Sequence, residues 1–122
     1  MSVETAKKLV KSKHWRWLSG MRPMRRSGVI WELLPVVDRN EPENRKRDLS
    51  DCVPCLGDGA TQGAILDLVR DAYGDPDACV GKFETDCWEV WTRHVKAARW
   101  VRQRMHGETM CEALLAALEA AP

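Results

Sequence analysis

Apolar residues recur at helical spacing in three segments of the chain, and the clearest of these lies in its middle. Four apolar residues there share one helical face: Ile65, Leu68, Val69 and Ala72. This helix is expected to begin at Ala60 or Thr61. It should end before Gly74-Asp75-Pro76, because glycine favours the left-handed C-cap and proline cannot continue a helix.

Two more helices are expected near the ends of the chain. Over residues 108–121 the apolar positions follow the spacing i, i+3, i+4, i+7: Cys111, Leu114, Leu115 and Leu118. At the N-terminus, Ser2 is a suitable N-cap, and Val3, Ala6 and Leu9 recur on one face. That first helix should fade between Lys13 and Trp17.

Short segments between the helices indicate strands. Residues 21–26 and 29–37 are expected to form one hairpin about a turn at Ser27-Gly28, and residues 79–83 and 87–93 a second about 84–86. Residues 94–105 fit either a helical stripe or a strand. We favour a strand over 99–105, because Gly107 and a new helix start at Glu108-Thr109 follow at once.

The resulting order is α-β-β-loop-α-β-β-β-α. It predicts an α+β fold, a single small domain over residues 1–122 in which an antiparallel sheet packs with two to three helices. A polar loop at 38–51 contains almost no apolar residues, which makes it a candidate mobile or partner-contacting segment. No apolar run is long enough to span a membrane, and no signal peptide opens the chain, so we expect a cytoplasmic protein.

Charge is distributed unevenly along the sequence although the formal net charge is only +1. Residues 1–47 hold twelve Lys or Arg against five acids, whereas residues 48–92 hold ten acids against Arg70 and Lys82. Either the two regions neutralise each other in the fold, or the basic region faces a partner. The sequence leaves both readings open.

Residues suited to catalysis or metal binding form no convincing set. Cys52 and Cys55 supply two ligands of a zinc site that needs four, and the other cysteines and histidines are scattered. His14, His94 and His106 have no acid placed in a recognisable catalytic motif. We therefore expect no enzyme, no metal, no cofactor and no catalytic residue.

Tryptophan is the dominant aromatic residue, with six Trp against one Tyr and one Phe. Basic and aromatic residues interleave near the N-terminus in a way that suits either a protein hot spot or nucleic acid. The predicted partner-binding residues are Trp15, Arg16, Arg22, Arg25 and Arg26. The alternative for Trp15 is that it only packs against the first helix.

The order of helix, three strands and helix over residues 60–121 is similar in layout to the double-stranded-RNA-binding fold. That family grips phosphate with lysines at the start of its last helix. Here that place holds Glu108 and Glu112, which would repel phosphate, so the similarity argues against RNA binding by that face.

Three blocks resemble small proteins encoded in phages and prophages of proteobacteria. They are His14-Trp15-Arg16-Trp17 with Gly20-Met21-Arg22, the stretch from Val53-Pro54 to Pro76 followed by Trp88, and the run Glu112 to Ala121. Those proteins read W-x-W-x-x-G-M-R, P-D-L-x-D-P-A-T-x-G-x-L-L-x-L-V-R-x-A-W-G-D-P and E-A-L-x-A-A-L-E-A-A. Cys55 and Gly59 depart from the pattern, where Asp and Pro are usual, which weakens a metal site at Cys52 and Cys55.

The resemblance implies a phage accessory protein acting in the cytoplasm of a bacterial host, and it carries over no catalytic residue. Such proteins often bind and block a host machine. The expected function is therefore a non-enzymatic inhibitor of a host protein or ribonucleoprotein complex, plausible as an anti-CRISPR or other anti-defence factor, without a membrane partner. The alternative is a small nucleic-acid-binding module that uses the basic N-terminal half.

Overall fold

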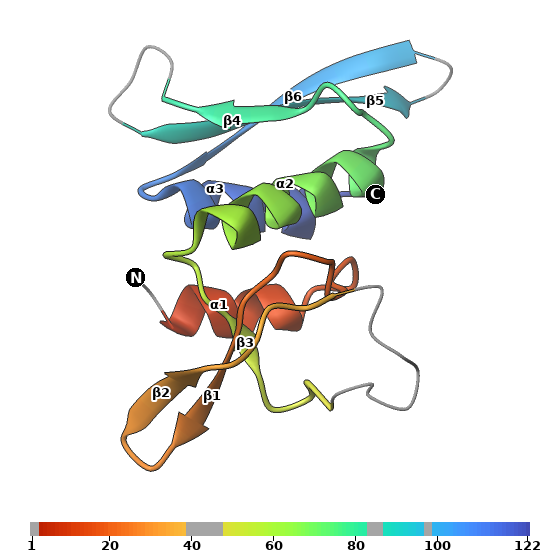
Figure 1. The fold of residues 1–122 in the computed structure, drawn as a ribbon. Coiled ribbons are helices and arrows are strands. Elements are labelled where there is room, and N and C mark those ends of the chain that lie inside the picture. Colours follow the sequence, from red (N-terminus) through yellow and green to blue (C-terminus); the bar gives the residue numbers. More distant parts are fainter. Residues whose placement is uncertain (1–2, 39–47, 83–86, 97–98) are drawn as a thin grey trace.

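Three layers of secondary structure lie one above another in the computed structural model, which describes residues 3–38, 48–82, 87–96 and 99–122 (Figure 1). One outer layer is the sheet of β4 (Cys79–Gly81), β5 (Trp88–Lys96) and β6 (Arg99–Gly107). The middle layer holds α2 (Gly59–Tyr73) and α3 (Met110–Ala120). The other outer layer combines α1 (Val3–Val10) with β1 (Pro23–Ser27), β2 (Ile30–Leu33) and β3 (Val53–Pro54).

Local sequence signals set both ends of α2. The Asp58 carboxylate caps its start by accepting a hydrogen bond from the Thr61 backbone N–H at 3.0 Å. Gly74 ends the helix with φ 63°, in the left-handed region that glycine adopts without strain. The predicted helix and its C-terminal stop are thus confirmed.

The last helix begins at Met110, directly after the start predicted at Glu108-Thr109. Thr109 is its N-cap, and the Thr109 hydroxyl accepts a hydrogen bond from the Glu112 N–H at 3.1 Å. The Glu112 carboxylate in turn accepts from the Glu108 N–H at 3.2 Å. This reciprocal arrangement fixes the entry into α3 directly after β6.

The first sheet has the order β2-β1-β3 and is antiparallel throughout. Ser27 is the Cα partner of Ile30, so the turn consists of Gly28 and Val29, one residue later than expected. The strand β3 was not predicted, because two residues are too few to show a period of alternation. It pairs Val53 with Met24 and Pro54 with Pro23.

The second sheet has the order β4-β5-β6, again antiparallel. Residues from Trp88 to Lys96 pair in register with residues from Gly107 to Arg99, which confirms the strand interpretation of 99–105. The α+β class and the antiparallel pairing are therefore confirmed. The strands form two separate sheets rather than one, because the helices lie between them (Figure 1).

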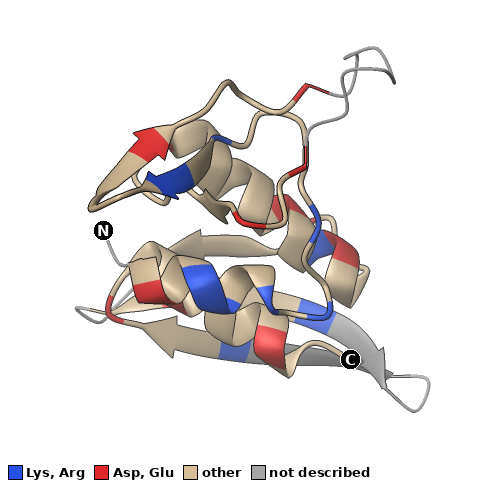
Figure 2. Cartoon of the chain, turned by 90° about the horizontal axis from the view of Figure 1, so that it is seen from below, with Lys and Arg blue, Asp and Glu red and all other residues tan. Residues whose placement is uncertain are grey.

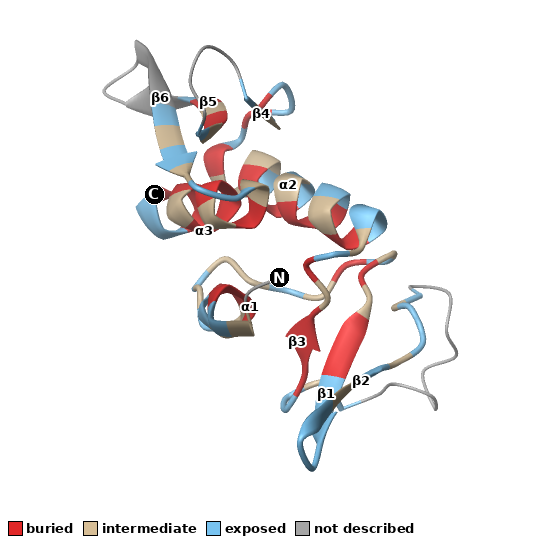
Figure 3. Cartoon of the chain, turned by 90° about the vertical axis from the view of Figure 1, so that its left-hand side faces the viewer, coloured by how far each residue is buried: buried red, intermediate tan, exposed pale blue. Residues whose placement is uncertain are grey.

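One hydrophobic cluster joins the layers. The predicted apolar stripes of α2 and α3 meet in it, with Leu68 and Leu114 at 1% and 0% exposure. Buried residues line the facing sides of the helices in Figure 3. The Tyr73 hydroxyl of α2 donates to the Ala117 carbonyl of α3 at 2.7 Å, which satisfies its polar end inside the core.

The predicted polar loop at 38–51 lies largely outside the described residues, which include only Asp38 and residues 48–51 of it. Both of its flanks are held by backbone hydrogen bonds. Val37 donates to the Met21 carbonyl at 2.9 Å, and Cys55 donates to the Arg22 carbonyl at 2.8 Å.

Candidate partner-binding surface

Trp15 and Arg16 lie against the C-terminal half of α2. The Trp15 ring meets the Trp17 ring edge-on, with centroids 5.3 Å apart and planes at 84°. The Arg16 guanidinium pairs with the Asp71 carboxylate. Both residues line a hollow of about 230 Å³ together with Leu68, Asp71 and Ala72 of α2.

Two ring nitrogens beside this hollow are buried. His14 Nε2 and Trp15 Nε1 have no hydrogen-bond partner among the described residues. A buried unsatisfied donor costs free energy, so the rings are held here by packing rather than by polar contacts. Trp15 is half-buried and packs against the core cluster, which gives it a structural role whatever else it binds.

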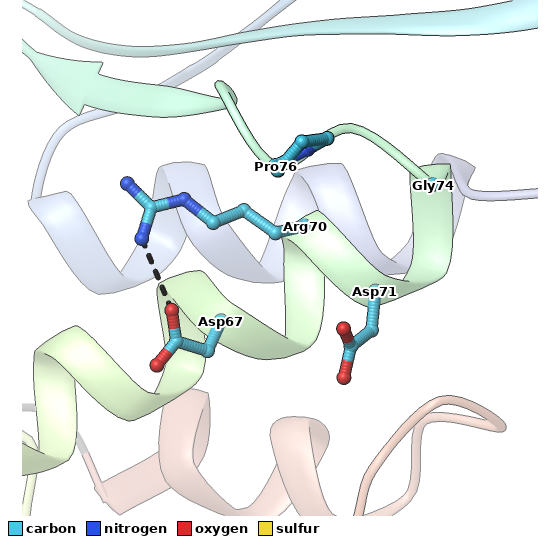
Figure 4. Close-up of a pocket in the computed structure, with 5 residues that line it drawn as sticks. All are labelled: Asp67, Arg70, Asp71, Gly74 and Pro76. Atoms are coloured by element: carbon cyan, nitrogen blue, oxygen red, sulfur yellow. Dashed lines mark hydrogen bonds and ion pairs between the residues drawn. The ribbon is translucent and has the colours of Figure 1, made fainter.

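A larger hollow of about 450 Å³ lies along the same helix and has Asp67, Arg70, Asp71, Gly74 and Pro76 on its walls (Figure 4). The Arg70 guanidinium donates to Asp67 Oδ1 at 3.0 Å and to the Ala78 carbonyl at 2.9 Å. Both sides of this guanidinium are therefore engaged within the chain. The arrangement ties α2 to the segment before β4 and presents no paired acid and base for catalysis.

Arg22 has a structural role in the N-terminal layer. Its backbone N–H donates to the Thr61 hydroxyl at 2.9 Å, and its Nη1 donates to the Leu34 carbonyl at 3.1 Å. The first bond joins the start of β1 to the first turn of α2. Substituting Arg22 would therefore disturb the fold as well as any partner.

Arg25 and Arg26 are exposed on β1, and as neighbours in a strand they lie on opposite faces of the sheet. Arg25 Nε lies 3.4 Å from Asp51 Oδ2, and Arg26 Nε donates to the Gly28 carbonyl at 2.9 Å. The five predicted residues are therefore not brought together. Trp15 and Arg16 lie beside α2, Arg22 directly precedes β1, and Arg25 and Arg26 are on β1.

The charge asymmetry of the sequence is partly neutralised in space. Arg16 and Arg25 of the basic region pair with Asp71 and Asp51 of the acidic region. Figure 2 shows basic and acidic segments interleaved across the N-terminal layer and α2. The two halves of the sequence are thus in part partners of each other, one of the two readings the sequence left open.

Among the residues whose burial the structure describes, the most exposed large apolar side chains lie on the β1–β2 hairpin and just after it, a segment predicted from the sequence only as a pair of strands. Val29 is 89% exposed, Ile30 67%, Leu33 58% and Val36 36%. In Figure 3 this end of the hairpin is pale blue and projects from the body of the protein. The sequence signal for this exposed surface was the mostly apolar run of residues 29–37, because the same segment also had to form the second strand of the predicted hairpin.

Strand β2 is an edge of its sheet. It pairs with β1 on one side, and no described strand pairs with its other side. An unpaired edge presents backbone N–H and C=O groups to any incoming strand, and proteins usually protect such edges with charge or proline. Here only Glu32 interrupts the sequence Ile30-Trp31-Glu32-Leu33.

The cysteines are five free thiols with different surroundings. Burial raises the pKa of Cys52, and it raises the pKa of Cys111 to about 11. A thiol held protonated is a poor nucleophile and a poor metal ligand at neutral pH. Within the described residues, no group of three or more His, Cys, Asp or Glu is placed to hold a metal.

Among the helices of the described residues, none combines the length and the apolar character needed to cross a membrane. In comparisons with known proteins, no family model, no curated protein and no solved structure matches this chain.

Proposed function

We propose that this protein is a non-enzymatic binding protein whose β1–β2 hairpin pairs with a strand of a host protein complex and inhibits that complex. The observation that carries the proposal is the exposed edge strand β2 together with its apolar side chains. Strand addition to such an edge gives affinity through backbone hydrogen bonds and specificity through alternate side chains.

The side chains of the hairpin suit this mode of binding. Ile30 and Leu33 offer apolar area at both ends of a four-residue strand, and Val29 extends it into the turn. Exposed Arg26 on the neighbouring strand would favour acidic residues beside the partner strand and speed the encounter. In this proposal Trp15, Arg16 and Arg22 hold the layers behind the hairpin in place.

The basic N-terminal half is less well suited to nucleic acid. Three of its arginines are engaged within the chain, namely Arg16 with Asp71, Arg22 with the Leu34 carbonyl and Arg25 with Asp51. A phosphate would have to displace these contacts. A protein partner that contacts the apolar hairpin would not.

The resemblance to small phage and prophage proteins directs the choice of partner. A phage accessory protein acts against complexes of its bacterial host, so we propose an anti-defence role and take a CRISPR effector as the first complex to test. Inhibition would follow from occupying a strand edge that the effector uses itself.

The test compares three versions of the full chain as bait in a bacterial lysate with quantitative mass spectrometry. One is the wild type and one carries Ile30→Thr with Leu33→Thr, which removes apolar area but keeps strand propensity. The control carries Lys8→Thr with Lys11→Thr at exposed positions at the end of α1. We expect at least one host protein to be captured by the wild type and the control and lost from the hairpin variant.

Melting curves of the three versions must agree before the result is read. Identical capture profiles for all three would show that the hairpin is not the interface. A plaque assay then tests the anti-defence role in a strain whose CRISPR system targets the infecting phage. The wild type and the lysine control should restore plaques, and the hairpin variant should not.

A further inference from the structure

Hydrogen bonds to β1 alternate along β2. The Leu34 N–H donates to the Pro23 carbonyl at 2.9 Å, in line with the register of the two strands. In an antiparallel ladder, residue pairs that exchange hydrogen bonds alternate with pairs that do not. Ile30 and Glu32 are in phase with Leu34, so they direct their backbone N–H and C=O groups toward β1.

The other two residues of β2 present their backbone groups to the free edge of the sheet. Trp31 and Leu33 are out of phase with Leu34, so their N–H and C=O groups point away from β1. No described strand lies on that side of β2. Pro35, which has no N–H to donate, follows shortly after β2 and limits the edge there. β2 thus offers a short edge to which one more strand can be added.

A second copy of β2 is one strand that this edge can accept. Two identical edges pair antiparallel about a two-fold axis perpendicular to the sheet. Residues that then lie opposite each other share a face of the sheet, and the outward backbone groups of the two copies must meet. Two registers fulfil these conditions with most of β2 paired, one centred on Trp31 and the other on Glu32.

Charge distinguishes these two registers. Pairing centred on Glu32 places the two Glu32 carboxylates directly opposite each other, which is destabilising. Pairing centred on Trp31 places Ile30 of each copy opposite Glu32 of the other. It also brings Leu33 beside Val29 of the other copy, and these side chains are 58% and 89% exposed in a single copy. The register centred on Trp31 therefore covers apolar surface without opposing like charges.

The charge of the whole molecule permits such an approach, and the size of the edge limits its strength. The formal net charge is +1, so two copies meet without strong mutual repulsion. A strand of four residues in each copy buries far less than the roughly 1,600 Å² of a standard protein–protein interface. An edge of this size fits a reversible association rather than a permanent dimer.

We propose that the free protein forms a reversible dimer in which β2 pairs with β2 of a second copy, in an antiparallel register centred on Trp31. The two N-terminal sheets then form one continuous sheet across the two-fold axis. The edge that we assign to a host strand is covered in this dimer and becomes available when the dimer dissociates. The dimer follows from the edge itself, whereas its role as a cap on the binding strand rests on the function proposed above.

The test is sedimentation velocity of the purified full chain over a range of concentrations, for the wild type, Ile30→Glu and Ile30→Lys. Both substitutions remove the same apolar side chain, which is 67% exposed, and melting curves check that the fold is kept. In the proposed register the introduced carboxylate faces Glu32 of the other copy, whereas the introduced ammonium forms a cross-strand ion pair with it. We expect Ile30→Glu to weaken dimerisation by at least about tenfold and Ile30→Lys by at most about threefold.

Net charge cannot produce this order of affinities. Ile30→Glu lowers the formal net charge from +1 to 0 and Ile30→Lys raises it to +2, so repulsion between whole molecules would favour the glutamate variant. A register centred on Glu32 predicts equal losses, because position 30 then faces Leu34. Equal losses, or a larger loss for Ile30→Lys, would overturn the proposed register.

Amide hydrogen exchange followed by NMR tests the pairing residue by residue. As the protein concentration rises, the N–H groups of Trp31 and Leu33 should exchange more slowly, while those of Ile30 and Glu32 are already bonded to β1 and should change little. A wild type that stays monomeric at its highest soluble concentration, with no change at Trp31 and Leu33, would overturn the proposal. That result would leave the host-capture experiment standing, and failed capture by a protein that does dimerise would overturn only the proposed function.

Discussion

The Asp75 carboxylate accepts a hydrogen bond from the backbone N–H of Arg93 at 2.8 Å and so joins the end of α2 to the central strand of the second sheet. β4 pairs with β5 only as far as Trp91, so Asp75 takes the place of the next strand residue for Arg93. The other carboxylate oxygen accepts from the Asp77 N–H at 3.0 Å. Asp75 itself is 2% exposed.

Removing the Asp75 carboxylate should therefore lower the stability of the fold. We expect Asp75→Ala to lower the free energy of unfolding by roughly 2–4 kcal/mol, because it leaves two backbone donors without a partner. Asp77→Ala is the matched control, since Asp77 is exposed and contacts the same arginine at 3.1 Å; it should cost less than about 1 kcal/mol. Urea titrations measure both, and equal losses would contradict the role given to Asp75.

Gly107 is packed too closely for any side chain. A Cβ there would lie 2.8 Å from the carbonyl carbon of Glu112 and closer still to the backbone nitrogen of Ala113. Gly107→Ala should thus push β6 from α3 and lower the melting temperature. Gly63→Ala should have the opposite sign, by about 1 kcal/mol, since its Cβ meets nothing within 4 Å inside α2. A neutral Gly107→Ala would show that the β6–α3 junction yields easily.

Leu68 and Leu114 are at the centre of the core. Replacing either by alanine is expected to cost roughly 2–5 kcal/mol, as for buried leucines that leave a cavity. Leu66→Ala is the control, because Leu66 belongs to the same helix as Leu68 but is only half-buried. Thermal unfolding ranks the three variants, and a Leu66→Ala loss as large as the others would contradict the assignment of the buried stripe.

The thiols should differ in reactivity in the order of their exposure. Cys79 and Cys87 are exposed and should react quickly with a maleimide, whereas Cys52 and Cys111 are buried and have raised pKa values. Mass spectrometry of the native protein should find label on the first two, and labelling after denaturation should reach all five. Early modification of Cys111 would show that α3 detaches from the core.

The raised pKa of Cys111 also predicts that the stability of the fold decreases at alkaline pH. The fold holds the Cys111 thiol protonated up to about pH 11, whereas in the unfolded chain it ionises near its ordinary pKa of 9.0. The unfolded state therefore binds fewer protons between these values, and the free energy of unfolding drops by roughly 2 kcal/mol by pH 11. Cys111→Ala should show a shallower decline in urea titrations between pH 8 and pH 11, and parallel declines would contradict the shift.

The elements whose apolar residues recur with a regular period were the ones that the sequence could predict. The stripe on α2, the glycine that ends it and the stripe on α3 all depend on neighbours three or four residues apart, so the signal is local. β3 and the separation of the strands into two sheets depend on which distant segments meet. Periodicity contains no information about that choice.

Part of the candidate surface could be predicted from the sequence in the same way. Arg25 and Arg26 were predicted as partner-binding residues because charge is visible in a sequence, and the structure places both at exposed positions, while their role in binding stays a prediction. Ile30 and Leu33 were missed as surface residues, because an apolar residue in a strand is normally expected to face a core. The outward direction of the Trp31 and Leu33 backbone groups depends on the register of β1 against β2, which no single segment specifies.

The backbone bonds on either side of residues 39–47 fix the two ends of that segment on one scaffold. Val37 is bonded to Met21, and Val53 pairs with Met24, so the chain departs from and returns to the neighbourhood of a single strand. The cost of a longer connection between fixed ends grows only logarithmically, by about 0.6 kcal/mol for each doubling of length. An epitope tag or a fluorescent label inserted at this point would therefore leave the hairpin and the second sheet unaltered, and would make the intact chain traceable inside a cell.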